Sequence, residues 1–326
     1  PLFNDLEPFN KDHNDLIQVV LGPRQVGKTT TVRKFLNEKF QGKALYVSAD
    51  AVFSPSFNWI NEHWRKARSE YDLLAIDEIQ KIEGWSEIVK KLWDEDRASG
   101  HNLKIILLGS SSLDIQKGLS ESLTGRFKLL RAWHWNLSES GELSGMGLEE
   151  YLKYGGYPGS YIFKDDQDEF VSFLKQSILS TVIDKDILRN HKVKSPALFR
   201  QAFEIINEYP AQEISYTKLL GQLQDKGNTD LVKYYLSLYE GAYLVKSLFK
   251  YSEKPLRRRS SSPKLLPLCP AFYFMNIQDE YNSEERGRAF ELIVGAQLSR
   301  LPVDLYYWRE RNDEVDFVVK KGKRGA

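Results

Sequence analysis

Eight residues near the start of the chain have the types and the spacing of a phosphate-binding loop. They read Gly22-Pro23-Arg24-Gln25-Val26-Gly27-Lys28-Thr29 and fit the pattern G-x-x-x-x-G-K-[ST] at every fixed position. The glycines allow successive backbone N–H groups to turn toward phosphate oxygens. We expect Lys28 to reach the β- and γ-phosphates of ATP, the Thr29 hydroxyl to hold Mg²⁺, and Thr30 to complete the binding segment. The simpler alternative is a glycine turn in front of an ordinary helix.

A pair of acids follows an apolar run further along the chain. Residues 73–76 read Leu-Leu-Ala-Ile and lead into Asp77 and Glu78. We expect Asp77 to hold Mg²⁺, mostly through water, and Glu78 to polarise the water that attacks the γ-phosphate. Because the cation occupies one carboxylate and the other stays available as a base, the pair indicates hydrolysis as well as binding. Two solvated carboxylates at a strand end are the alternative.

The segments around these residues predict an α/β fold with a parallel sheet. Apolar runs predict buried strands at residues 17–21, 44–48, 73–78, 104–110 and 128–130. Amphipathic patterns predict helices over 30–40 and 86–95, the first with an apolar face of Val32, Phe35, Leu36 and Phe40. Alternating strands and helices place ligands at the carboxyl ends of the strands. Ser110 or Ser111 would then contact the γ-phosphate or the attacking water; a simple turn is the alternative.

With these motifs in view, the sequence resembles the AAA+ superfamily, and more narrowly a group of bacterial and archaeal ATPases. Residues 122–127 (S-L-T-G-R-F) are similar to the S-L-x-G-R segment of that group, and residues 155–159 (G-G-Y-P-G) are similar to its G-G-Y-P segment. The resemblance covers nearly the whole chain. It implies four parts: a P-loop ATPase domain over 1–140, a helical lid over 141–194, a winged helix over 195–255, and a partial nuclease-like α/β domain over 256–326.

Two residues in these segments are candidates for the nucleotide site. A guanidinium at Arg126 would stabilise charge on the transferring phosphoryl group, in trans if subunits pack in a ring. The alternative is a surface arginine paired with a carboxylate. The resemblance implies that Pro158 packs on the adenine, and the alternative for this segment is a tight turn between helices.

The middle of the chain predicts helices over 148–154 and 168–185, and then three more before a strand. Helices from Pro196 to about Tyr209, from Ser215 to Leu223 and from Thr229 to Glu240, followed by a strand over 243–251, are typical of a winged helix. The outward face of the third helix carries one cation and one anion among Asp230, Lys233, Tyr234 and Ser237, which is a poor surface for DNA phosphates.

A basic run follows this strand. It consists of Arg257, Arg258 and Arg259, with Lys254 and Lys264 close in sequence. These residues lie in a Ser/Pro-rich linker that would either bind a nucleic-acid backbone or be solvated. Packing or docking of a protein partner is favoured over specific DNA recognition. His134, between two tryptophans, is expected to be packed rather than catalytic.

The end of the chain predicts a helix and a hairpin. The helix spans 287–298, with Phe290, Ile293, Val294 and Leu298 expected to be buried, and the strands span 305–308 and 315–319. Glu291 and Asp316 resemble the first two acids of a PD-(D/E)xK nuclease core, which binds Mg²⁺. The third element is missing because the sequence stops at Ala326. The alternative is that the two acids form ion pairs near Arg288 and Arg309.

Composition limits the remaining classes. The 326 residues predict two or three domains, and a net charge of +1 names no polyanionic partner. No apolar run approaches the roughly 20 residues of a membrane span, and no signal peptide is evident. The single cysteine, Cys269, forms no intrachain disulfide and favours a cytoplasmic protein. We therefore predict a Mg²⁺-dependent AAA+ ATPase that drives or switches its attached domains, with a homo-oligomer possible. An ATP-gated DNA-binding regulator and an ATP-regulated nuclease are the alternatives.

Overall fold

The computed structural model describes residues 2–11, 16–53, 55–109, 112–223, 228–253, 261–277, 280–322 and 324–325. The chain divides into two compact units, Pro1–Trp133 and His134–Ala326. We call them the N-terminal and the C-terminal unit and describe each by itself.

The N-terminal unit is built on a parallel sheet of five strands in the order β2-β3-β4-β1-β5. The strands are β1 (Ile17–Leu21), β2 (Ala44–Ser48), β3 (Leu73–Asp77), β4 (Lys104–Gly109) and β5 (Phe127–Arg131). All five lie where the apolar runs predict strands. In this order β4 separates β1, which leads into the phosphate-binding loop, from β3, which ends at Asp77.

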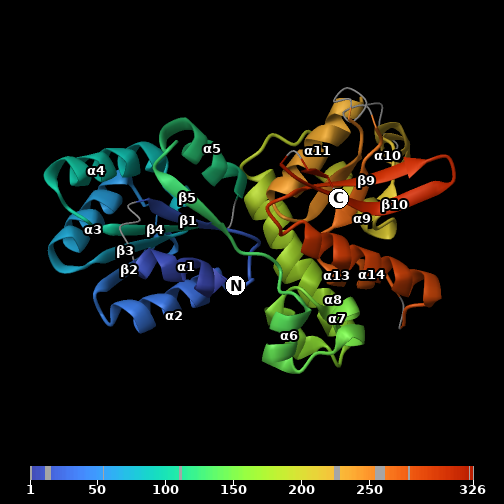
Figure 1. Ribbon diagram of the computed structural model, residues 1–326, viewed down its shortest axis with the longest axis horizontal. Helices are drawn as coiled ribbons and strands as arrows, with labels where there is room; N and C mark the ends of the chain where they lie inside the picture. Colours follow the sequence, from blue (N-terminus) through green and yellow to red (C-terminus); the bar gives the residue numbers. More distant parts are fainter. Residues whose placement is uncertain are drawn as a thin grey trace. The chain divides into compact units, whose positions relative to one another are not determined.

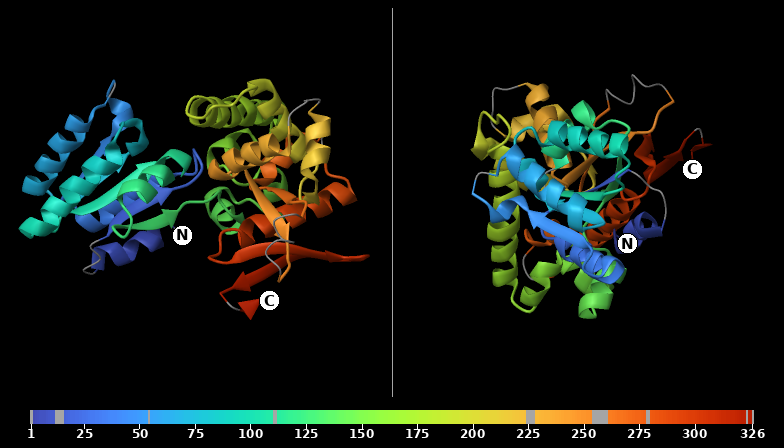
Figure 2. Two further views of the ribbon diagram at one scale, coloured as in Figure 1. Left: turned by 90° about the horizontal axis from the view of Figure 1, so that it is seen from above. Right: turned by 90° about the vertical axis from the view of Figure 1, so that its left-hand side faces the viewer.

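Helices cover both faces of this sheet (Figure 1). On one face lie α1 (Leu2–Lys11) and α2 (Lys28–Phe40), and on the other lie α3 (Phe57–Glu70), α4 (Trp85–Ser99) and α5 (Ser112–Ser122). The left view of Figure 2 shows the same layers. Because strand side chains alternate between faces, Val20 packs toward α1 and α2 whereas Val19 and Leu21 pack toward the other layer. The predicted apolar face of α2 is buried, whereas α1, α3 and α5 were not among the predicted helices.

The C-terminal unit begins with a run of helical elements. They are α6 (Leu137–Ser144), α7 (Leu148–Tyr154), the 3-10 helix η3 (Pro158–Phe163), α8 (Gln167–Phe173) and two π-helical stretches, η4 (Leu174–Leu179) and η5 (Thr181–Leu188). The prediction of α7 is confirmed, and the helix predicted over 168–185 is continuous. Its second part is π-helical, a feature that hydrophobic spacing alone does not reveal.

Three helices and three short strands follow. The helices are α9 (Pro196–Glu208), α10 (Tyr216–Gln222) and α11 (Thr229–Gly241), and the strands are β6 (Gln212–Glu213), β7 (Val245–Lys250) and β8 (Lys264–Pro267). Side chains of Ser195, Ser215 and Asn228 cap the helices by accepting backbone N–H groups. Strand β8 pairs antiparallel with both β6 and β7, which gives the order β6-β8-β7. The three helices and β7 agree with the predicted segments; β6 and β8 were not predicted.

Two helices and three strands complete the C-terminal unit, and the strands extend the same sheet. The helices are α13 (Pro270–Phe274) and α14 (Ser283–Leu298), and the strands are β9 (Asp304–Glu310), β10 (Asp313–Lys321) and β11 (Arg324–Gly325). Strand β9 pairs parallel with β7 and antiparallel with β10, so the predicted hairpin is confirmed and joins a six-stranded sheet.

The predicted buried face of α14 is wrong in part. Phe290 is 47% exposed, whereas Ala289 and Leu292 are fully buried. A Cβ placed on Gly295 would lie 2.6 Å from the Phe317 ring, so α14 packs closely on the sheet through its small residues. That close approach turns the bulkier Phe290 outward.

Candidate nucleotide-binding site

The phosphate-binding loop joins β1 to α2, as the motif requires. Arg24 and Gln25 form its turn, and Gln25 has a φ of 57°. Gly27 has a φ of 85° and caps the N-terminus of α2, so the first backbone N–H groups of that helix open toward the loop. Pro23 and Val26 are buried, whereas Thr30 is exposed on the first turn of α2.

Lys28 lies inside this loop. Its side chain is buried, and its ammonium group donates to the carbonyl oxygens of Gly22 at 2.9 Å and Pro23 at 2.6 Å. A buried ammonium needs such acceptors, because an unsatisfied charge is costly. The cation is therefore held within the loop whose backbone would surround a phosphate group.

Thr29 and Asp77 meet, although β3 is distant from the loop in sequence. The Thr29 hydroxyl donates to Asp77 Oδ2 at 2.6 Å. A hydroxyl and a carboxylate side by side form an oxygen-only donor set, which suits Mg²⁺. The two predicted metal-binding residues are thus together and chemically fit for that ion.

Tyr46 also contacts Asp77, and it was not among the predicted site residues. Its hydroxyl donates to Asp77 Oδ2 at 2.6 Å, while the Glu78 N–H donates to Asp77 Oδ1 at 2.8 Å. Burial, followed by the hydrogen bond and charge of Asp77, raises the pKa of Tyr46 well above its usual value of 10, so the hydroxyl stays a donor. The sequence alone gave no signal for this contact, because it follows from the strand register: Ser48 pairs with Asp77, and Tyr46 lies two residues earlier on the same face.

Glu78 follows Asp77 with a left-handed backbone φ of 52°. Its Oε2 accepts a hydrogen bond of 2.5 Å from Gln80 Nε2. Gln80 in turn lies against the end of β4, because a Cβ on Gly109 would come within 2.5 Å of Gln80 Oε1. The predicted base is therefore held beside the strand end that leads to Ser110 and Ser111, which lie outside the described residues.

Arg126 lies where the strands of the sheet begin, whereas the loop lies where they end. Its carbonyl accepts from Ile17 N at 2.9 Å, which places it beside the start of β1, whereas the loop follows the end of β1. Its guanidinium forms a two-point ion pair with Asp94, with Nε at 2.9 Å and Nη2 at 3.1 Å from the two carboxylate oxygens. Arg126 is thus paired with a carboxylate in this structure, and its role at a nucleotide stays a prediction.

The segment that contains Pro158 packs within the C-terminal unit. Pro158 is partly buried and begins η3, and a Cβ on the preceding Gly156 would lie 2.4 Å from Cys269 Sγ. The Tyr157 hydroxyl lies 3.0 Å from His134 Nε2, so His134 is packed as expected. These contacts belong to a close turn between helices, and an adenine contact for Pro158 stays a prediction.

Glu291 and Asp316 are brought together, but their ion-pair partner differs from the one considered. Lys264 Nζ lies 2.6 Å from Glu291, 2.7 Å from Asp316 and 3.2 Å from Glu314. Arg288 instead pairs with Glu284, and Arg309 with Glu213 and Glu314.

Placing Lys264 in a solvated basic linker was therefore wrong. It lies in β8 with its side chain 4% exposed. Strand pairing draws it inward, and the three carboxylates keep it charged there. Among the residues that the structure describes, no group of three acids, cysteines or histidines is arranged to hold a metal.

The surfaces considered for DNA carry little positive charge where they are described. Asp230, Lys233, Tyr234 and Ser237 face outward on α11, as predicted, and Lys233 pairs with Asp230 at 3.1 Å. Lys254 and the run Arg257–Arg259 lie outside the described residues.

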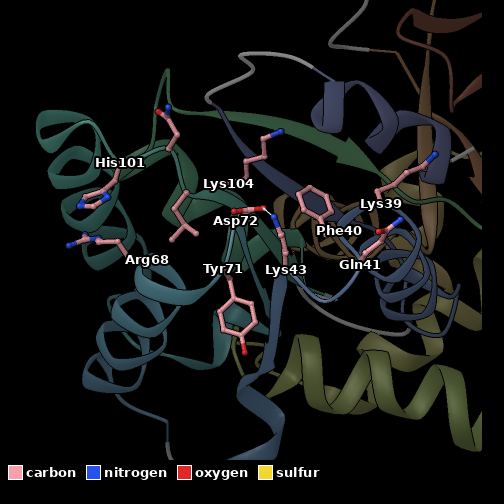
Figure 3. Close-up of a pocket in the computed structure, with 11 residues that line it drawn as sticks. Lys39, Phe40, Gln41, Lys43, Arg68, Tyr71, Asp72, His101 and Lys104 are labelled. Carbon is pink, nitrogen blue, oxygen red and sulfur yellow. Dashed lines mark ion pairs between the residues drawn. The ribbon is translucent and has the colours of Figure 1, made fainter.

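A pocket of about 680 Å³ lies at the strand-start edge of the N-terminal sheet (Figure 3). It is lined by Lys39, Phe40, Gln41, Lys43, Arg68, Tyr71, Asp72, His101, Asn102, Leu103 and Lys104. Its lysines and arginine are already paired: Lys39 with Glu7, Lys43 with Asp72, Arg68 with Asp96, and Lys104 with the carbonyl of Phe9. Because the pocket lies where the strands begin, it is separate from the nucleotide loop, which follows the opposite ends of the strands.

Comparison with known proteins agrees with this geometry. Residues 14–141 match the family model of an AAA domain. Residues 146–268 match a domain of unknown function (DUF8612). The first match contains the whole phosphate-binding loop and both acids, so it supports nucleotide binding by this part of the chain.

Two relatives are similar over most of the chain. The uncharacterized protein MJ1544 of Methanocaldococcus jannaschii is 27% identical over 335 residues, which cover 93% of this chain and 72% of the relative. The uncharacterized protein Rv2008c of Mycobacterium tuberculosis is 26% identical over 321 residues, covering 96% of this chain and 69% of the relative.

A solved structure shows a similar fold. The Walker-type ATPase PabY2304 of Pyrococcus abyssi is 17% identical and superposes with a TM-score of 0.55, covering 85% of this chain and 95% of that one. At this identity the likeness concerns the fold alone. Within the described part of the chain, no helix is both long and apolar enough to cross a membrane.

Proposed function

We propose that this chain binds and hydrolyses ATP with Mg²⁺ as an AAA+-type ATPase. The observation that carries the proposal is the 2.6 Å contact between Thr29 and Asp77. It joins the start of α2 to the end of β3, so the two halves of a nucleotide-binding motif meet beside the buried ammonium of Lys28.

Each residue then has a chemical role. The loop backbone from Gly22 to Lys28 surrounds the phosphates, and Lys28 exchanges its carbonyl contacts for phosphate oxygens. Thr29 and Asp77 hold Mg²⁺, which supplies charge neutralisation at the phosphates. Glu78 takes up a proton from water, and the Gln80 amide, which donates to Oε2, holds its carboxylate in place.

Three further roles belong to the same proposal. Arg126 reaches the nucleotide of a second copy in a homo-oligomer, because it lies where the strands of its own sheet begin and its own loop lies where they end. Pro158 contacts the adenine, and Ser110 contacts the γ-phosphate or the attacking water. The assignment of Pro158 comes from the sequence resemblance, whereas those of Ser110 and Arg126 come from their places next to predicted strands of the sheet.

We also propose what the nucleotide controls. The helices from α6 to η5 act as a lid, and the segment from α9 to β8 is a winged helix. Its helix–strand order and its β6-β8-β7 sheet support that name. ATP binding and hydrolysis would switch or drive these parts and the partial nuclease-like region, in the cytoplasm and with a protein partner. The nuclease alternative has less support, because Lys264 already forms ion pairs with the two acids that would bind its metal.

The test combines two variants of the full chain. Lys28→Ala is expected to abolish ATP binding measured by calorimetry. Glu78→Gln is expected to keep ATP binding within about threefold but to lower turnover by at least about 100-fold, as expected for loss of a general base. Lys34→Ala is the matched control, because Lys34 lies on the same helix with its side chain 67% exposed.

The outcomes separate binding from hydrolysis. Wild-type chain that is folded and gives neither heat nor thermal protection with Mg²⁺-ATP would refute the whole proposal. Phosphate release by Glu78→Gln at the wild-type rate would refute the role of Glu78 alone. ATP binding by Lys28→Ala equal to that of Lys34→Ala would refute the role of Lys28.

A further inference from the structure

We propose that Tyr46 is a positioning residue for the metal of this site and acts through Asp77. The inference rests on the proposed nucleotide function and extends it to a residue outside the two motifs. Tyr46 belongs to β2, the outer strand of the sheet, and its hydroxyl donates directly to Asp77 Oδ2 at 2.6 Å.

The hydrogen bonds around Asp77 leave its carboxylate little freedom. Oδ2 accepts two hydroxyl groups, from Thr29 and from Tyr46, each at 2.6 Å. Oδ1 accepts the Glu78 N–H at 2.8 Å. A carboxylate has about four acceptor positions, two on each oxygen. Both positions on Oδ2 are therefore used, and the second position on Oδ1 would be the one available toward a metal.

The ring of Tyr46 is itself anchored by the helix that follows the loop. The guanidinium of Arg33, on α2, lies 5.2 Å from the ring centroid. The ring also packs against the core between α2 and the sheet. Because α2 carries Lys28 and Thr29 as well, the phenol connects Asp77 to the same helix that holds the nucleotide.

Thr29 alone cannot replace this contact when a metal is bound. Its oxygen would then coordinate the ion while its hydrogen still bonds Oδ2, so without Tyr46 the carboxylate would be held by two contacts, from Thr29 and the Glu78 N–H, instead of three. Tyr46 is not a metal ligand in this proposal, so its hydroxyl would remain a second donor to Oδ2. Outer partners of metal ligands typically contribute about 10- to 100-fold to metal affinity. We expect Tyr46 to contribute about tenfold, the lower end of that range.

The experiment measures metal binding directly, without turnover. Full-length Tyr46→Phe keeps the ring and removes only the hydroxyl. Mn²⁺ is titrated into chain saturated with ADP, and free Mn²⁺ is followed by electron paramagnetic resonance. ADP affinity in the presence of EDTA is measured in parallel. Tyr71→Phe is the control, since it makes the same chemical change elsewhere in the N-terminal unit, beside the pocket of Figure 3.

We expect Tyr46→Phe to bind Mn²⁺ about tenfold more weakly than wild type, with metal-free ADP affinity within twofold. Tyr71→Phe should match wild type in both. Unchanged or tighter Mn²⁺ binding by Tyr46→Phe would overturn the inference. So would an equal loss of metal-free ADP binding, or failure of the variant to fold, because either would show a structural role. Absence of ADP binding by the wild-type chain would instead refute the proposed function on which the inference rests.

Discussion

The two glycines of the phosphate-binding loop are required for different physical reasons. Gly22 lies against the backbone of the segment that follows β5, and a Cβ there would come 2.3 Å from the carbonyl oxygen of Ala132. Gly27 has open space around its Cα but a φ of 85°, which residues with a Cβ rarely adopt. Gly22 leaves no room for a side chain, and Gly27 requires a left-handed backbone.

This difference predicts two separate effects on stability. Gly22→Ala should lower the free energy of unfolding by about 2 kcal/mol, because backbone atoms must move to admit the methyl group. Gly27→Ala should lower it by about 1 kcal/mol, the cost of a left-handed conformation. Urea denaturation followed by circular dichroism measures both.

Gly221 provides the control for these substitutions. It lies on the exposed side of α10, and a methyl group added there would meet nothing within 4 Å. Gly221→Ala should therefore raise stability by up to about 1 kcal/mol, since alanine is the better helix former. A Gly22→Ala protein as stable as wild type would show that the contact with Ala132 is not restrictive.

Among the elements, β8 is joined to α14 and β10 through one buried cation. Burial by itself would lower the pKa of Lys264, but hydrogen bonds to Asp316 and Glu291 outweigh burial and raise the pKa above 10.5. Burial would also raise the pKa of Asp316, yet Lys264 outweighs it, and that pKa lies below 3.8. Burial does prevail at Glu291, whose pKa lies above 4.5 although Lys264 opposes the shift. The lysine thus remains charged at neutral pH.

Replacing this cation should destabilise the C-terminal unit. Lys264→Met keeps the length of the side chain and removes the charge, leaving Glu291 and Asp316 close together without a counter-ion. We expect a loss of about 2 kcal/mol, less than for a fully buried pair because the Asp316 side chain is 53% exposed. Lys233→Met, at an exposed pair on α11, should change stability by less than about 0.5 kcal/mol.

The pH dependence gives a second check on this cluster. Because the folded-state pKa of Lys264 is raised, its stabilisation is present below pH 10.5 and is lost as pH rises through that higher pKa. The difference in unfolding free energy between wild type and Lys264→Met should therefore shrink in strongly alkaline solution. A difference that stays constant there would mean that packing, not charge, explains the loss.

For the whole molecule, the position of Arg126 bears on its proposed role in trans. Strand β1 separates Arg126 from the loop of its own chain, and five residues span roughly 15 Å at 3.3 Å per residue. If Arg126 acts at phosphates, as proposed, those phosphates would be bound by a neighbouring copy. Arg126 must also give up its two-point contact with Asp94 on joining that neighbour.

Mixing two inactive variants tests this arrangement. Arg126→Ala lacks the arginine and Glu78→Gln lacks the base, so each alone should be inactive. In a mixed assembly some interfaces combine an intact Glu78 with an intact Arg126, and part of the phosphate release should return. Mixtures that co-assemble by mass measurement yet stay inactive would contradict action in trans. Phosphate release by Arg126→Ala alone at the wild-type rate would contradict any catalytic role for Arg126.

The sequence by itself determined the nucleotide loop, the strands that carry it and the two acids at the end of β3. These features follow from local rules, which depend only on residues close together in the sequence. Examples are the backbone conformation at Gly27, the apolar runs, and helix caps such as Ser195. The same rules located α9, α10 and α11 to within a few residues.

Only the tertiary structure decided which distant side chains meet. Tyr46 reads as an ordinary core residue until strand pairing places it beside Asp77. Lys264 reads as a linker cation until β8 pairs between β6 and β7 and buries it against Glu291. Helix α14 exposes Phe290 because close packing at a glycine sets its rotation. Each outcome depends on strand order and register, which arise from contacts between segments far apart in sequence, where local propensity carries no information.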